Sequence, residues 1–75
     1  MTQAERRHLE AAANRYLHRG MIGKSVATYA RLGHRGVYVT KLRQEADASL
    51  RQGDATHAMA AYIAASCLNL AHRPK

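Results

Sequence analysis

The sequence predicts an all-α fold, a small bundle of three to four helices that is most simply arranged as two stacked helical hairpins. Three observations support it. Alanine is abundant, which favours helices and lets their backbones approach closely. Apolar residues recur at helical spacing, and glycines separate the helical segments. At 75 residues the chain is one domain. We expect residues 1–72 to form this domain and residues 73–75 to be a basic tail.

The first predicted helix runs from Gln3 to Arg19. Thr2, followed three residues later by Glu5, matches a capping box, in which each side chain bonds the backbone of the other residue. Gly20 suits the left-handed conformation that commonly ends a helix. The sequence therefore predicts both ends of this element.

The middle of the chain is predicted to form two helices that are separated by a turn. The second predicted helix runs from Lys24 to Leu32, and residues 33–36 form a turn that contains two glycines. The third predicted helix runs from Tyr38 to Gln52. Because Val37 and Val39 are β-branched, its first one or two residues could be extended.

The fourth predicted helix begins after Gly53, with Asp54 as its N-cap, and ends near Ala71. Its sequence is apolar almost all the way round, so we expect it to be buried on every side or covered by a second molecule. The interpretation that we favour slightly is a homodimer. The residues expected to carry this self-association are Met59, Tyr62, Ile63 and Leu68.

The two halves of the chain align at an offset of 33 residues. The aligned pairs are Leu9 with Leu42, Ala13 with Ala46, Leu17 with Leu50, Gly20 with Gly53, Ala27 with Ala60, and Tyr29 with Tyr62. The second half resembles a tetratricopeptide-repeat hairpin at Ala46, Leu50, Gly53, Asp54, Ala58, Tyr62 and Ala65. The first half departs from that pattern at Met21, Ser25 and Leu32. The resemblance implies protein or peptide binding on a shallow surface, and it assigns no binding residues.

Positive charge is concentrated in the middle of the chain. The net charge is +7, and no Asp or Glu occurs between Ala11 and Gln44. A local excess of this kind favours an acidic or polyanionic partner. We expect the partner-binding residues to share one exterior patch, with Tyr38 as an aromatic anchor. These residues are Arg15, Arg19, Lys24, Arg31, Arg35, Tyr38, Lys41 and Arg43.

Three functions are compatible with this pattern. The leading hypothesis is a non-catalytic adaptor, regulator or inhibitor that docks on an acidic surface of a larger protein or complex. The first alternative is a DNA- or RNA-binding protein with a helix-turn-helix-like unit over residues 27–43, although Tyr29 stands where close helix contact needs a small residue. The second alternative is a structural subunit that assembles through its C-terminal helix.

Catalysis and metal binding lack a sequence signal. No two histidines stand three or four residues apart on one predicted helix, so we expect surface or capping histidines, no metal site and no cofactor. The carboxylates occupy capping or polar positions, and we expect no enzyme activity. Cys67 has no disulfide partner and is expected to be buried. With no signal peptide and no apolar span, we expect a cytoplasmic protein without a membrane partner.

Overall fold

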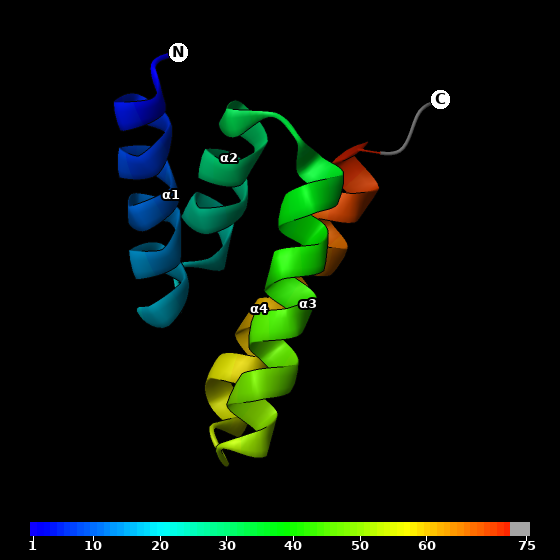
Figure 1. Cartoon of the computed structure of the whole chain (residues 1–75). Coiled ribbons are helices and arrows are strands. Elements are labelled where there is room, and N and C mark those ends of the chain that lie inside the picture. Colours follow the sequence, from blue (N-terminus) through cyan, green and yellow to red (C-terminus); the bar gives the residue numbers. More distant parts are fainter. Residues whose placement is uncertain (73–75) are drawn as a thin grey trace.

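The computed structural model describes residues 1–72 as four helices with no strands, which confirms the predicted all-α bundle (Figure 1). The helices are α1 (Gln3–His18), α2 (Ile22–Leu32), α3 (Arg35–Arg51) and α4 (Ala55–His72). The predicted basic tail, residues 73–75, lies outside the described residues.

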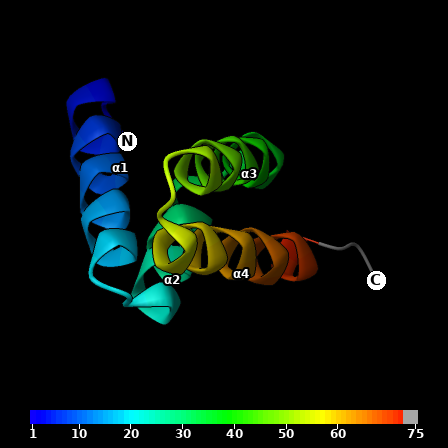
Figure 2. The same cartoon turned by 90° about the horizontal axis from the view of Figure 1, so that it is seen from below.

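The helices pair as two hairpins. Helix α1 packs against α2, and α3 packs against α4 along its length. Each hairpin turns at a glycine with positive φ, Gly20 at 77° and Gly53 at 84°, a conformation that a residue without Cβ adopts at no steric cost. Both α2 and α4 contact each of the other three helices, whereas the backbones of α1 and α3 stay apart (Figures 1 and 2).

The predicted caps at two helix starts are present. The Thr2 hydroxyl accepts a hydrogen bond from the Glu5 backbone N–H, and the Glu5 carboxylate accepts one from the Thr2 N–H. At α4, the Asp54 carboxylate accepts a bond of 3.0 Å from the His57 N–H. Because these N–H groups have no partner within their own helices, the caps determine where both helices begin.

Helix α3 begins three residues earlier than predicted. The turn consists of Gly33 and His34, whose φ angles are 76° and 51°, and the chain is helical from Arg35 onwards. The extended start expected at Val37 is therefore wrong. Tyr38 and Val39 are buried on the same helix face as Leu42, and this burial outweighs their weak preference for extended backbone.

Small residues dominate the core around α4. Ala61 and Ala64 are completely buried, and they pack in one cluster with Ala13, Leu17 and Leu42 from the other hairpin and from α3. Inside the first hairpin, the buried Ser25 hydroxyl donates a 2.8 Å hydrogen bond to the Ala13 carbonyl. This bond satisfies a polar group that would otherwise be buried at a cost.

One side of α4 remains exposed, so the alternative in which the chain itself buries this helix on every side is wrong, and coverage by a second molecule stays a prediction. Met59 is 63% exposed and Ile63 is 44% exposed, with Tyr62 beside them. Leu68, which the sequence predicted to take part in self-association, is instead fully buried in the core. Cys67 is exposed, contrary to its predicted burial. Because residues on a helix are about 100° apart, an apolar run must present some members to each side.

The two halves of the chain correspond in backbone structure but differ in which side chains are buried. Helices α2 and α4 begin at residues that correspond at the 33-residue offset, and the two turn glycines share positive φ. Leu17 is buried, whereas its counterpart Leu50 is exposed. The first hairpin packs against the second through α2 and α4, whereas Leu50 of the second hairpin lies at the surface.

The alanine-packed core should not tolerate larger side chains. We predict that Ala64→Leu lowers the free energy of unfolding by about 1–3 kcal/mol, because the helices cannot separate without losing contact. Urea denaturation measures the change. The matched control is Ala48→Leu, at an exposed position of α3, which should change the value by less than about 0.5 kcal/mol. Equal effects of the two substitutions would contradict the close packing.

Candidate functional site

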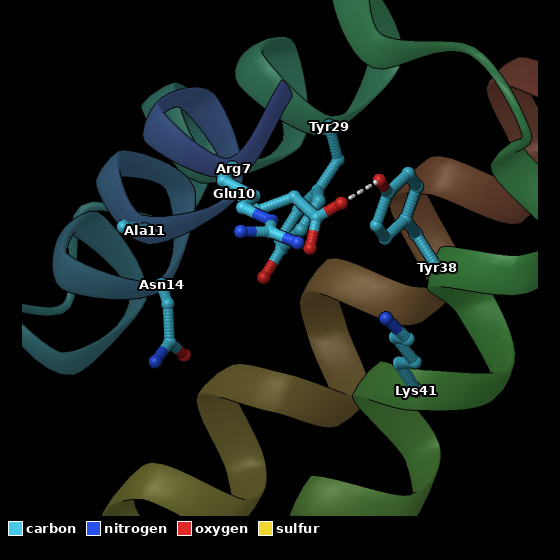
Figure 3. A pocket seen from close by; sticks show the side chains of 7 residues that line it. All are labelled: Arg7, Glu10, Ala11, Asn14, Tyr29, Tyr38 and Lys41. Atoms are coloured by element: carbon cyan, nitrogen blue, oxygen red, sulfur yellow. Dashed lines mark hydrogen bonds between the residues drawn. The ribbon is translucent and has the colours of Figure 1, made fainter. Parts of the chain in front are cut away.

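A groove of about 320 Å³ lies between α1 and α3, where the two helix backbones stay apart. Figure 3 shows the side chains that line it, from α1, α2 and α3. We call it the α1–α3 groove, and its lining consists of Arg7, Glu10, Ala11, Asn14, Tyr29, Tyr38 and Lys41. A hollow with an aromatic floor and a few polar groups is the usual form of a binding site.

Two tyrosines form the floor of the groove. The rings of Tyr29 and Tyr38 have centroids 5.0 Å apart and are tilted by 35°, an arrangement that aromatic pairs favour. The Tyr38 hydroxyl donates a 2.6 Å hydrogen bond to the Glu10 carboxylate, which is drawn as the dashed line in Figure 3. This bond spans the space between α3 and α1, and it holds Glu10 at the floor.

The surroundings of both tyrosines favour the neutral phenol. Burial raises the pKa of Tyr29 to about 12, and the carboxylates of Glu45 and Glu10 add to the effect. Burial, followed by the hydrogen bond to Glu10, raises the pKa of Tyr38, while the nearby Arg6 opposes this increase. The two phenols of the floor are therefore uncharged at neutral pH.

Positive charge lies at the edges of the groove. Arg7 on α1 and Lys41 on α3 are both exposed, and the Lys41 ammonium lies 5.6 Å from the centroid of the Tyr38 ring. In the described part of the chain the ion pairs join histidines to Glu45, and neither Arg7 nor Lys41 pairs with a carboxylate. The two cations are available to an acidic ligand.

The aromatic anchor predicted at Tyr38 is wrong. Its side chain is only 4% exposed, lies against Tyr29, and uses its hydroxyl on Glu10. The sequence could not show this, because Tyr38 follows a glycine-containing turn and its burial depends on the position of α1. Tyr38 thus contributes to the groove as part of its floor and not as a projecting side chain.

The predicted basic residues do not all face the same side of the molecule. Lys41 and Arg43 are two positions apart on α3, so their side chains leave the helix about 160° apart, and only Lys41 lines the groove. Arg15 on α1 and Arg19, the C-cap directly after it, are exposed, and Lys24 and Arg31 share an exposed face of α2. Arg35, partly buried, is the first residue of α3. The charge excess is therefore spread over three helices.

Of the residues that line the groove, only Tyr38 and Lys41 were predicted as site residues, whereas Arg7, Glu10, Ala11, Asn14 and Tyr29 were not. Arg7 lies outside the acid-free segment, and Asn14 carries no charge, so neither stood out. Arg6 also supports the site from α1, since its guanidinium donates a 3.1 Å hydrogen bond to the Leu32 carbonyl at the end of α2. The one available signal was the pair of adjacent arginines at the start of a predicted helix.

Three residues with metal-ligating side chains meet elsewhere in the fold. His18, Glu45 and His57 each offer a ligand atom, and these atoms lie within 4.8 Å of one another. His57 is largely buried, so the expectation that the histidines are surface or capping residues does not hold for it. Because the three residues come from three different helices, no local spacing in the sequence could reveal them.

The chain matches no protein-family model, and neither a curated protein nor a solved structure is significantly similar to it. Among the described residues, no helix has the length and apolar character that crossing a membrane requires.

The pKa of Tyr29 makes a prediction about stability at high pH. Because folding raises that pKa from about 10 to about 12, its contribution is complete below pH 10 and is lost as the pH rises toward 12. Tyr29→Phe keeps the ring and removes the titration. We therefore expect the free energy of unfolding to decline less steeply between pH 10 and 12 in this variant, as measured by urea denaturation. The same decline in both proteins would be evidence against the buried neutral phenol.

Proposed function

We propose that this chain is a small, non-catalytic binding protein, an adaptor, regulator or inhibitor, which docks an acidic segment of a larger protein in its α1–α3 groove. The single observation that carries the proposal is the pair of cations without carboxylate partners, Arg7 and Lys41, at the edges of an aromatic-floored groove. Charge complementarity of this kind steers an acidic partner to the site and determines its orientation.

The groove is prepared for a ligand before binding. The Glu10 carboxylate is held at the floor by the hydrogen bond from the Tyr38 hydroxyl. Arg6 is held by the carbonyl of Leu32, which ties α1 to the end of α2. Because these side chains are already ordered, a ligand does not bear the entropic cost of ordering them.

The resemblance to tetratricopeptide repeats is consistent with this function. The groove lies between α1 and α3, which are the first helices of the two hairpins. Helix α4 packs against the other helices on a second surface. The family resemblance implies protein or peptide binding, and two hairpins provide a short groove suited to a brief acidic segment. Relationship to that family remains part of the proposal.

Nucleic-acid binding is the weaker alternative. The exposed residues of the helix-turn-helix-like unit include Thr40, Lys41 and Arg43 on α3, whereas Tyr38 is buried and cannot reach a base edge. The exposed cations lie on opposite sides of α3, so they would not follow one phosphate backbone together. These features favour an acidic protein over DNA or RNA.

Charge reversal in the groove tests the proposal. We predict that Arg7→Glu combined with Lys41→Glu weakens binding of a fluorescein-labelled oligoglutamate peptide about tenfold, measured by fluorescence anisotropy at low salt. The control is Arg15→Glu combined with Arg43→Glu, which changes the net charge equally at exposed positions outside the groove lining.

The control variant should retain at least half of the parent affinity. Equal loss in both double variants would show that net charge, and not the groove, holds the peptide. A duplex DNA that binds more tightly than the peptide, and is weakened by the control substitutions as strongly as by the groove substitutions, would favour the nucleic-acid alternative.

Self-assembly through α4 is a second candidate, favoured by the exposed apolar side chains of Met59, Tyr62 and Ile63. We predict that the chain sediments as a dimer at high concentration and that Ile63→Glu converts it to a monomer. Ala27→Glu, at an exposed position of α2, should leave the dimer intact. A parent chain that remains monomeric in sedimentation equilibrium at millimolar concentration would exclude this candidate.

A further inference from the structure

A cluster of two histidines and one glutamate joins three helices at the end of the bundle where α4 begins. His18 is the last residue of α1, Glu45 lies in α3, and His57 lies in the first turn of α4. The Oε1 atom of Glu45 lies 3.8 Å from Nε2 of His18 and 3.4 Å from Nε2 of His57. None of the three residues lines the α1–α3 groove, so this cluster is a separate site.

The spacing of these atoms suits one small ion. Ligand atoms about 2.0–2.1 Å from a tetrahedral zinc ion lie about 3.3–3.4 Å from one another. The separation between Glu45 and His57 matches that value, and the separation between Glu45 and His18 exceeds it by a few tenths of an ångström. All three ligand atoms lie within 4.8 Å of one another, so modest side-chain rotation brings them around a common centre.

His57 carries a buried polar atom that the protein itself does not satisfy. Its side chain is 9% exposed, and Nε2 has no hydrogen-bond partner, although the Glu45 carboxylate is near. Among the described residues, no other buried side-chain nitrogen or oxygen lacks a hydrogen-bond partner. Buried polar groups are nearly always paired, so an unpaired imidazole nitrogen facing a carboxylate and a second imidazole indicates a missing ligand.

Coordination of one ion by both histidines requires a change in the orientation of their rings. The His18 and His57 rings are stacked, with centroids 4.1 Å apart and an angle of 2° between their planes. A metal ion lies close to the plane of each imidazole that binds it, and two parallel ring planes cannot both contain the same ion, so one ring must turn out of the stack before both Nε2 atoms reach it. Neutral imidazoles are the form that binds metal ions.

The framework permits the small movement that coordination needs. The backbone N–H of His57 is bonded to Asp54, which determines where the His57 side chain leaves α4. The His18 side chain is 55% exposed, and it can turn so that its Nε2 and that of His57 point toward one ion. A cavity of about 140 Å³ adjoins both rings, with Gly20, Asp54 and Thr56 also in its lining. It has room for water at a fourth coordination position.

We propose that His18, Glu45 and His57 bind a divalent transition-metal ion of the zinc class, with water in the fourth position. Two imidazoles and a carboxylate form a ligand set that suits zinc, whereas magnesium and calcium require mostly oxygen ligands. Because the ligands come from α1, α3 and α4, the ion joins the first hairpin to the second. Metal binding therefore stabilises the arrangement of the two hairpins.

Isothermal titration calorimetry of the metal-free chain tests the site. The titrations use Zn²⁺ after treatment with a chelator, in a Cys67→Ser background because the exposed thiol could bind metal on its own. We expect one equivalent of Zn²⁺ to bind, Mg²⁺ not to bind, and Co²⁺ to give the visible absorption of a tetrahedral complex. At a hundredfold excess over Kd, Zn²⁺ should raise the melting temperature by roughly 10 °C or more.

Variants distinguish this cluster from adventitious binding. His18→Gln and Glu45→Gln should each weaken Zn²⁺ binding at least tenfold, since changes to residues outside the ligand set already cost about 10–100-fold in other sites. His18 is half exposed, so its replacement should leave the fold intact by circular dichroism. The control is His8→Gln on the exposed side of α1, which should bind as the parent does. Absence of stoichiometric Zn²⁺ binding, or parent-like affinity in His18→Gln, would overturn the proposal.

Discussion

The close contact of α4 with the other three helices is the constraint on which the rest of the structure depends. Alanines at positions 58, 61, 64 and 65 are buried, and they let neighbouring backbones approach where larger side chains would hold them apart. Each alanine buries little apolar area, so the gain comes from many contacts rather than from a few large side chains. The four-helix arrangement thus rests on small residues placed on one helix.

The packing of α4 against the other helices positions both the α1–α3 groove and the histidine cluster. Because α4 contacts α1, α2 and α3, it joins the hairpins while α1 and α3 remain apart, and the α1–α3 groove lies between them. The same contacts bring the start of α4 to the end of α1, where His57 stacks on His18 beside Glu45. One packing arrangement therefore produces a basic groove and, separately, a cluster of metal-ligating side chains.

The elements of the fold could be predicted from the sequence, whereas their relative positions could not. The structure confirms the local signals that act over a few residues. These are the capping pair Thr2 and Glu5, the N-cap Asp54 and the turn glycines. The start of α3 was misplaced because burial of Tyr38 and Val39 overrides their local preference. Local chemistry determines where a helix begins, and tertiary packing determines which of its faces is covered.

The candidate sites were harder to predict for the same reason. Lys41 was identified from charge alone, but its partner Arg7 lies on another helix, and the role of Tyr38 changed from anchor to floor. The charges of the middle segment were correctly located in sequence, yet the 100° step of the helix directs them to different sides. The histidine cluster depends on contacts between residues far apart in the chain, and no spacing rule reports such contacts.

The central claim is that the buried alanines of α4 hold the two hairpins in a single arrangement. Nuclear Overhauser spectroscopy tests it most directly, through the ring protons of His18 and His57, whose centroids are 4.1 Å apart. The account predicts clear cross-peaks between these two rings at neutral pH, together with cross-peaks between the methyl groups of Leu17 and Ala61. Absence of both sets, in a chain whose four helices are otherwise formed, would show that the hairpins are not packed as described.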